Sequence, residues 1–305
     1  MTKAFWDYAV DPTTKIPRWF INSTTLTSIS PHYSTDFNKW YYPILSMMAK
    51  LTDEPYFKNS LWKMTQTIYI NYTSPITGLA PVAIINGNPQ SHVEFFRATQ
   101  GAYGLMVAGE ILNDTRYTNL GLRQIGLIDD YMWDGPRWDN VNTHWVTSVS
   151  IDGVLLDNHV ENMDADGLVA FFKAYQLTGN TTYRDHAYAY SNLLNQTQYD
   201  DLQGVPNKNI LAPSGAVSFM DNRRLIFPDT ILAAWLYGYY YTRDAWFYSL
   251  LNQTSSQLNY YKGSYGFGCL YNSMDRQLAS PRYYEYQFYE YPDLYLLKRW
   301  NERVI

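Results

Sequence analysis

A short motif that ends in an aromatic residue recurs four times along the chain, and its spacing limits what the chain can fold into. The four copies read Leu-Thr-Asp-Glu-Pro-Tyr, Leu-Asn-Asp-Thr-Arg-Tyr, Leu-Thr-Gly-Asn-Thr-Thr-Tyr and Tyr-Thr-Arg-Asp-Ala-Trp. They end at Tyr56, Tyr117, Tyr183 and Trp246, which are 61, 66 and 63 residues apart. Such a period is too long for the common solenoid repeats, and it fits a helical hairpin followed by a connecting loop.

Apolar periodicity places a pair of helices around each motif. We expect first helices at residues 36–51, 92–112, 164–178, 227–242 and 282–300, and second helices at 55–71, 115–132, 181–197 and 244–260. The first helix of each pair is apolar on most sides, whereas second helices include charged residues such as Lys58 and Arg123. A helix that is apolar all round is buried, and one with a single apolar stripe lies outside. The pattern therefore predicts inner helices enclosed by outer helices.

The composition argues against several classes of function. The net charge is −5 and 17% of residues are charged, with no run of Lys and Arg, which argues against a nucleic-acid partner. The longest nearly apolar run, residues 231–241, is too short for a membrane span, which needs about 20 residues. Cys269 is the single cysteine, which excludes an internal disulfide and a cysteine-based zinc site. The oligomeric state is left open.

Three features of the sequence belong together: the alternation of buried and amphipathic helices, the turn at residues 177–183 and the Thr-Gly-Leu-Ala-Pro segment at 77–81. With these features the chain resembles the (α/α) toroid of the six-hairpin glycosidase superfamily. The resemblance covers nearly the whole chain. It implies an all-α fold, an (α/α) toroid of about five to six helical hairpins with short β segments in the loops on one face. It also implies one domain over residues 1–305, with a carbohydrate cleft where the loops lead into the inner helices.

Acidic side chains and a histidine stand where the inner helices are expected to begin. His92 and Glu94 precede the second inner helix, Asp164 the third and Asp229 the fourth. In a toroid these residues would surround the cleft. Asp and Glu are also favoured at helix N-termini, through capping and the helix dipole, so capping is the alternative interpretation of each carboxylate taken alone.

The segment before the third inner helix has more polar groups than capping requires. Asp157, His159 and Glu161 alternate, so in an extended segment they project from one face, and Asn162 and Asp164 follow. Crowded carboxylates repel, so one stays protonated as an acid while another is ionised, as glycoside hydrolysis requires. The alternatives are a solvated polar loop and a calcium site built from Asp157, His159, Glu161 and Asp164. Apart from calcium, we expect no metal or cofactor.

Three further sets of residues are candidates for substrate binding. Trp138 and Trp145 lie in an irregular segment between residues 133 and 150, where tryptophan rings would stack on sugars or cover the core. Arg223 and Arg224 precede the fourth inner helix, where they would bind the carboxylate of an acidic sugar or form structural salt bridges. Tyr284 lies near the start of the last inner helix.

The first hypothesis of function is a glycoside hydrolase that acts on a poly- or oligosaccharide. One of Asp157, Glu161 and Asp164 would protonate the glycosidic oxygen. Asp229, across the cleft, would activate water or attack the sugar directly. A carboxyl separation of about 6.5–9.5 Å would indicate inversion of the anomeric centre, and about 5 Å retention.

Two alternatives belong to other classes. The resemblance also covers polysaccharide lyases and uronate epimerases, in which a Tyr or His base removes a proton beside a uronate carboxylate. His159 or Tyr284 would then be the base, with Asn162 and Arg223 neutralising the carboxylate. The other alternative is a surface protein that binds glycans or partners without catalysis.

Six Asn-X-Ser/Thr sequons favour an extracellular or cell-surface protein. The numbers of Asn, Ser and Thr in the chain predict about three sequons by chance, half of those present. The sequons begin at Asn22, Asn71, Asn113, Asn180, Asn195 and Asn252. We therefore expect a secreted glycoprotein.

Overall fold

The computed structural model describes residues 10–17, 20–21, 28–30, 32–133, 144–158, 164–197, 208–211, 217–221, 228–260, 270–271 and 278–280. The chain falls into two units. Unit 1 comprises Met1–Trp133 and Trp145–Asp157, and unit 2 comprises Asp134–His144 and Asn158–Ile305. The single domain expected over residues 1–305 stays a prediction.

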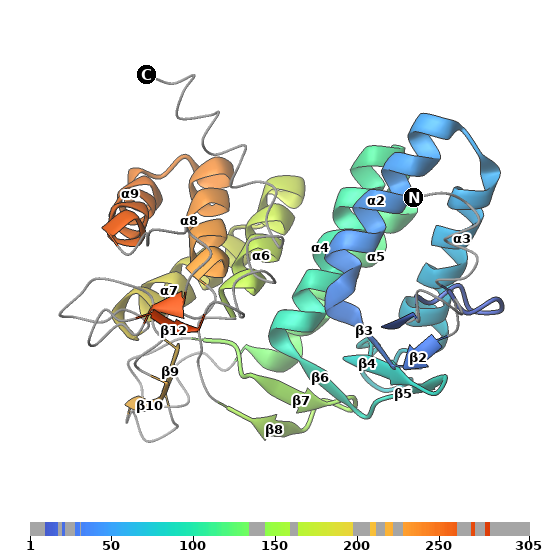
Figure 1. Cartoon of the computed structure of the whole chain (residues 1–305), viewed down its shortest axis with the longest axis horizontal. Helices are drawn as coiled ribbons and strands as arrows, with labels where there is room; N and C mark the ends of the chain where they lie inside the picture. The colour runs from blue at the N-terminus through green and yellow to red at the C-terminus, as the bar shows by residue number, and fades with distance from the viewer. Residues whose placement is uncertain are drawn as a thin grey trace. The chain divides into compact units, whose positions relative to one another are not determined.

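The α-helices of the described residues are paired in hairpins, two in each unit (Figure 1). Unit 1 holds α2 (Asn38–Thr52) with α3 (Pro55–Gln66), and α4 (Phe95–Leu112) with α5 (Thr115–Met132). Unit 2 holds α6 (Ala165–Thr178) with α7 (Thr181–Thr197), and α8 (Pro228–Thr242) with α9 (Ala245–Tyr260). These helices confirm the predicted hairpins, and a π-helical turn, η2 (Thr67–Asn71), extends α3 to its predicted end. The helix expected at 282–300 lies outside the described residues.

A left-handed residue follows the first helix of every described hairpin and ends that helix. These residues are Asp53, Asn113, Gly179 and Arg243, with φ between 52° and 69°. In three of the four turns a threonine just before this residue donates its hydroxyl to the carbonyl four residues earlier, at 2.6–2.7 Å. The recurring motif is therefore a backbone turn, in which only one copy uses the glycine that this conformation favours.

First helices are more completely buried than second helices, as predicted, with α2 as the exception. Residues 165–174 of α6 are all buried, and α4 buries side chains around most of its circumference. In contrast, α5 buries one stripe, which runs from Tyr117 to Met132. On α2, Ile44 and Leu51 are exposed, so this first helix buries only one side. No described helix has both the length and the apolar character needed to cross a membrane.

Short strands occupy the segments that lead into the helices, as predicted. Unit 1 has two antiparallel three-stranded sheets: β3 (His32–Ser34), β4 (Ala83–Ile85) and β5 (Asn88–Pro89) in one, and β6 (His92–Glu94), β7 (Ser148–Ser150) and β8 (Leu155–Asp157) in the other. Two-stranded ribbons pair β1 (Phe20–Ile21) with β2 (Ser28–Ser30), β9 (Lys208–Leu211) with β10 (Val217–Asp221), and β11 (Leu270–Tyr271) with β12 (Leu278–Ser280). Figure 1 shows β3–β8 gathered at the end of α2 and α4 where these helices begin.

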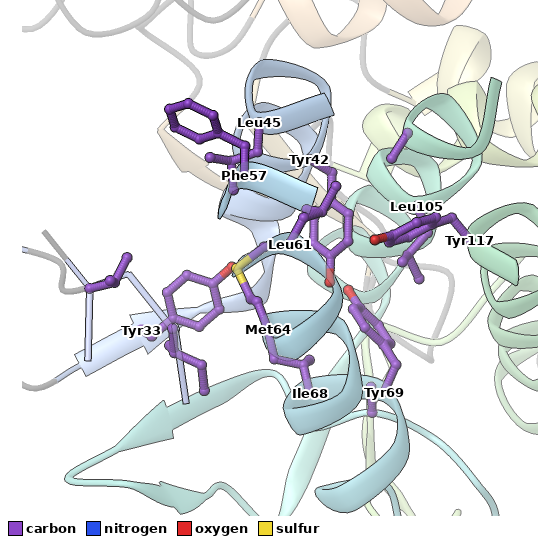
Figure 2. Packing of buried hydrophobic residues seen from close by; sticks show 14 of the residues in the cluster. Tyr33, Tyr42, Leu45, Phe57, Leu61, Met64, Ile68, Tyr69, Leu105 and Tyr117 are labelled. Carbon is purple, nitrogen blue, oxygen red and sulfur yellow. The ribbon is translucent and has the colours of Figure 1, made fainter. Parts of the chain in front are cut away.

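The core of unit 1 is packed from several of its helices (Figure 2). Its fully buried members include Tyr42, Leu45, Leu61, Met64, Ile68 and Leu105. The rings of Tyr42 and Tyr69 meet edge to face, with centroids 6.3 Å apart. Thr65 donates its hydroxyl to Tyr42 Oη at 3.0 Å, and Asn38 Nδ2 donates to Tyr69 Oη at 2.6 Å. The phenol groups are therefore hydrogen-bonded although they are buried, as an apolar interior requires.

These core tyrosines predict a loss of stability at alkaline pH. Burial raises the pKa of both Tyr42 and Tyr69 above the ordinary value of 10. As the pH rises past about 10, the unfolded chain releases the phenol protons while the folded chain keeps them, so the free energy of unfolding falls. Urea unfolding at a series of alkaline pH values should show this decline. Tyr42→Phe removes one of these phenols and should make the decline shallower.

Gly104 allows α4 to approach α2 closely. A Cβ atom at this position would lie 2.2 Å from the backbone oxygen of Asn38 and 2.7 Å from its carbonyl carbon. We expect Gly104→Ala to lower the free energy of unfolding by about 1–3 kcal/mol, the typical effect of overpacking. Without a close contact, alanine would be favoured over glycine inside a helix by about 1 kcal/mol. The sign of the change in the free energy of unfolding, measured with urea, therefore tests whether the contact is present. A stabilised variant would show that the two helices are not in this close contact.

Candidate active site

The sheet β6–β7–β8 places polar side chains of unit 1 in one row. Glu94 of β6 pairs with Ser148 of β7, which pairs in turn with Asp157 of β8. The neighbouring row holds Val93 and Val149, which are buried, and Leu155 on the edge strand, which is exposed. Because successive side chains of a strand point to opposite faces, Glu94 and Ser148 share the face opposite the core.

A bulge in β8 keeps Asp157 on this polar face. Val149 pairs with Leu155 while Ser148 pairs with Asp157, so Leu156 is the extra residue of the bulged strand. Neighbouring strands lie about 4.8 Å apart, so the backbones of Glu94 and Asp157 are roughly 10 Å apart across Ser148. The structure thus brings together two predicted site residues that are 63 positions apart in the sequence.

Two basic side chains flank Glu94. His92 Nε2 lies 3.4 Å from Glu94 Oε1, and Arg97 Nε lies 3.1 Å from Glu94 Oε2. The Arg97 contact is an ion pair without the direction of a hydrogen bond. All three side chains are partly open, with 34%, 24% and 30% of the His92, Glu94 and Arg97 side chains exposed. Glu94 occupies the N-cap of α4 without capping it, so its carboxylate is engaged with His92 and Arg97 instead.

Trp145 attaches this sheet to the helices. Its ring stacks on Phe95 with centroids 5.0 Å apart, meets Trp133 at 4.8 Å, and donates Nε1–H to Asp129 at 3.0 Å. The backbone N–H of Phe95 donates to Thr147 at 2.9 Å. Trp145 is fully buried, which favours the alternative that this tryptophan covers the core over a sugar-stacking role.

Asp164 lies in the interior of unit 2. Tyr190 of α7 donates its hydroxyl to Asp164 Oδ2 at 2.7 Å, and both side chains are fully buried. Asp164 precedes α6 but makes no capping hydrogen bond, so the capping interpretation of this residue is wrong. The ring of His144 lies 6.5 Å from that of Tyr190, and His144 Nε2 is 2.8 Å from Asn158 Oδ1. In this arrangement Asp164 joins α6 to α7, and its predicted catalytic role stays a prediction.

The other predicted site residues lie where the structure gives no side chain. Asp229 falls in the first turn of α8, and its side chain is outside the description. The remaining positions outside the described residues are Trp138, His159, Glu161, Asn162, Arg223, Arg224 and Tyr284. Their roles stay predictions.

The described residues contain no group of three or more His, Cys, Asp or Glu side chains that could hold a metal ion. The calcium site suggested by the sequence combines Asp157 and Asp164 with His159 and Glu161. The latter two are outside the described residues, so that site stays a prediction.

The sequence did not predict three residues that contact the candidate site residues: Arg97 and Ser148 beside Glu94, and Tyr190 beside Asp164. Arg97 stands one helical turn after Glu94, a spacing at which opposite charges meet on a helix, so this signal was present. Ser148 and Tyr190 are recognised only through long-range contacts, across β7 and between α6 and α7.

Several solved structures have a similar fold. Cellobiose 2-epimerase from Bacillus thermoamylovorans matches 85% of this chain and 69% of its own, with a TM-score of 0.67 and 8% identity. The α-1,2-mannosidase from Trichoderma reesei matches 84% of this chain and 58% of its own, with a TM-score of 0.69 and 12% identity. The GH76 α-mannanase from Bacteroides thetaiotaomicron matches 88% and 71%, with a TM-score of 0.61 and 15% identity. The chain has the (α/α) toroid fold.

This result confirms the architecture implied by the sequence resemblance. At identities this low the likeness establishes the fold alone, and the activity has to be argued from the site. No protein-family model matches the chain, and no curated protein matches it.

The buried Tyr190–Asp164 pair predicts a specific stability effect. Tyr190→Phe removes the hydroxyl that donates to a buried carboxylate, so we expect the free energy of unfolding to fall by about 1–3 kcal/mol. Asp164→Ala removes the acceptor of the same hydrogen bond. The double variant should therefore lose less stability than the sum of the losses of the two single variants. Urea unfolding of the four proteins of this cycle measures the coupling. Strictly additive costs would contradict the pairing of these two side chains.

Proposed function

We propose that the protein is a carbohydrate-active enzyme, and specifically a glycoside hydrolase that acts on a poly- or oligosaccharide. The observation that carries this proposal is the row Glu94–Ser148–Asp157, which sets two carboxylates on one face at the start of α4. The mannosidase and the mannanase with similar folds support the substrate class, as does an endoglucanase from Klebsiella pneumoniae with a TM-score of 0.60 and 13% identity over 91% of this chain.

The row suits an inverting mechanism. Inverting hydrolases hold their two carboxyl groups about 6.5–9.5 Å apart, which leaves room for a water molecule, whereas retaining enzymes hold them about 5 Å apart. The backbones of Glu94 and Asp157 are two strand spacings apart, roughly 10 Å in total. This separation allows their carboxyl groups to lie within the range of about 6.5–9.5 Å. Ser148 lies between Glu94 and Asp157 in the row.

The neighbours of each carboxylate suggest its role. Glu94 forms an ion pair with Arg97, which suits the ionised base that takes a proton from the attacking water. The acid that protonates the departing glycosidic oxygen is assigned to Asp157 because it is the other carboxylate of the row. His92 contacts one carboxylate oxygen of Glu94 and Arg97 contacts the other, and these contacts orient the base.

A sugar epimerase is the second candidate function, and a different observation favours it. His92 lies 3.4 Å from Glu94, which makes a histidine–carboxylate pair able to remove a proton from a sugar carbon and return it. The cellobiose 2-epimerases with similar folds support this candidate. The polysaccharide lyase or uronate epimerase predicted from the sequence, with His159 or Tyr284 as the base, stays a prediction, because both residues lie outside the described residues.

The sequons support an extracellular or cell-surface location for either enzyme. A substrate outside the cell would be a polymer or an oligosaccharide rather than a phosphorylated sugar. We propose no cofactor, since acid–base chemistry of the two carboxylates needs none.

Site variants provide the main test of hydrolysis. In a screen of neutral and uronate-containing polysaccharides, release of reducing ends should identify the substrate. Glu94→Gln and Asp157→Asn should each lower kcat by about 10²–10⁴-fold, because each removes an acid–base group. Asp53→Asn, in the exposed turn after α2, is the control and should retain full activity. Wild-type activity in both site variants would refute the carboxylate row as the site.

The products separate the two candidate functions. Proton NMR of a hydrolysis reaction should first show the inverted anomer, and retention would contradict the proposed geometry. An epimerase would release no reducing ends. In deuterated water it would convert a disaccharide into an isomer that carries one carbon-bound deuterium, and His92→Ala would abolish this exchange.

A further inference from the structure

Among the sequons within the described residues, two lie in turns between the helices of a hairpin. Asn113 follows α4 and Asn180 immediately precedes α7. Both asparagines are exposed, and so are the threonines two positions later, Thr115 and Thr182. Because the acceptor sequence includes this hydroxyl, an oligosaccharide-transferring enzyme has to reach both ends of the tripeptide. At these two turns both ends are at the surface of the folded chain.

The sequon at Asn252 provides a contrast. Asn252 is exposed, but it lies in the middle of α9, and Thr254 is fully buried. The sequon at Asn71 falls between these cases. Asn71 is exposed, but Thr73 is half-buried and donates its hydroxyl to the Ile70 carbonyl at 3.1 Å. The sequence pattern does not distinguish these four sites, whereas the structure does.

A glycan is compatible with the hydrogen bonds of both turns. Asn180 Oδ1 accepts the backbone N–H of Thr182 at 3.1 Å, and an N-linked sugar attaches to Nδ2, so this bond at the start of α7 is kept. In the other turn the residue that caps α5 is Asp114, which accepts the backbone N–H of Arg116 at 3.1 Å. Asn113 is therefore not needed as the cap. Modification therefore breaks neither helix start.

The position of Asn113 also keeps a glycan away from the candidate active site. Glu94 and Asn113 flank the two ends of α4, whose 18 residues span about 27 Å. Figure 1 shows α4 running away from the sheet that carries Glu94 and Asp157. A sugar chain on this turn would cover the far end of the hairpin and leave the carboxylate row open.

We propose that Asn113 and Asn180 are the acceptors of N-linked oligosaccharides in the folded protein, and that Asn252 is not. The donor is an oligosaccharide carried on a lipid phosphate. The side-chain amide nitrogen bonds to the anomeric carbon, the bond from that carbon to the phosphate oxygen breaks, and the amide proton passes to the departing lipid phosphate. Glycosylation and the proposed function both require an extracellular location and are otherwise independent. A test of glycan occupancy and a test of polysaccharide cleavage can therefore give opposite results.

Peptide mass spectrometry of the full chain isolated from its own cells tests the proposal. Peptides with Asn113 and Asn180 should carry a glycan on most molecules, and the peptide with Asn252 should be unmodified. Thr115→Ala and Thr182→Ala, which keep the asparagines, should each remove one glycan mass from the intact protein. Bare Asn113 and Asn180, or full occupancy of Asn252, would overturn the proposal.

A reaction in vitro tests the cause of the selection. The folded full chain is incubated with a single-subunit oligosaccharyltransferase and a lipid-linked oligosaccharide, beside a sample unfolded in urea and then diluted into the reaction. The folded chain should accept sugar at Asn113 and Asn180, and only the unfolded chain should accept it at Asn252. Equal modification of Asn252 in both samples would show that burial of Thr254 does not select the acceptor.

Discussion

The close packing of α4 against its neighbours is the constraint on which the rest of unit 1 depends. A Cβ atom at Gly104 would meet the backbone of Asn38 at 2.2 Å, and one at Gly121 would meet Met106 Cγ at 2.7 Å. These glycines let α2 and α5 approach α4 on two sides. The start of α4 is thereby held in place, and it carries Glu94 and, through Trp145 and Phe95, the sheet that presents Asp157.

The hairpins could be predicted from the sequence because their turns are local. A left-handed residue stops the first helix in all four turns, and in three of them a threonine hydroxyl bonds to the preceding helical turn. The turns recur although the residue at the left-handed position changes from Asp53 to Asn113, Gly179 and Arg243. A non-glycine residue pays roughly 1–2 kcal/mol for this conformation, and the surrounding turn compensates for it. Local chemistry of this kind is visible in a window of a few residues.

The candidate site could be predicted only in part, because strand pairing joins distant segments. His92, Glu94 and Asp157 were recognised as chemically suitable residues, but their sharing of one sheet depends on three-residue strands that give no periodic signal. Asp164 was recognised from its place before α6, and its neighbour Tyr190 lies on a different helix. The capping interpretation of Asp164 was wrong because its carboxylate accepts the buried hydroxyl of Tyr190 and makes no capping hydrogen bond to α6.

The fold itself does not decide between hydrolysis and epimerisation. Structures named as epimerases and as hydrolases match this chain equally well, at 8–15% identity. What distinguishes the two reactions is which groups face the sugar. Hydrolysis needs two carboxylates with room for water between them, whereas epimerisation needs a base beside a carbon–hydrogen bond. We propose the row across Ser148 for the first requirement and the His92–Glu94 pair for the second, so the two proposals share Glu94 and differ in their use of Asp157.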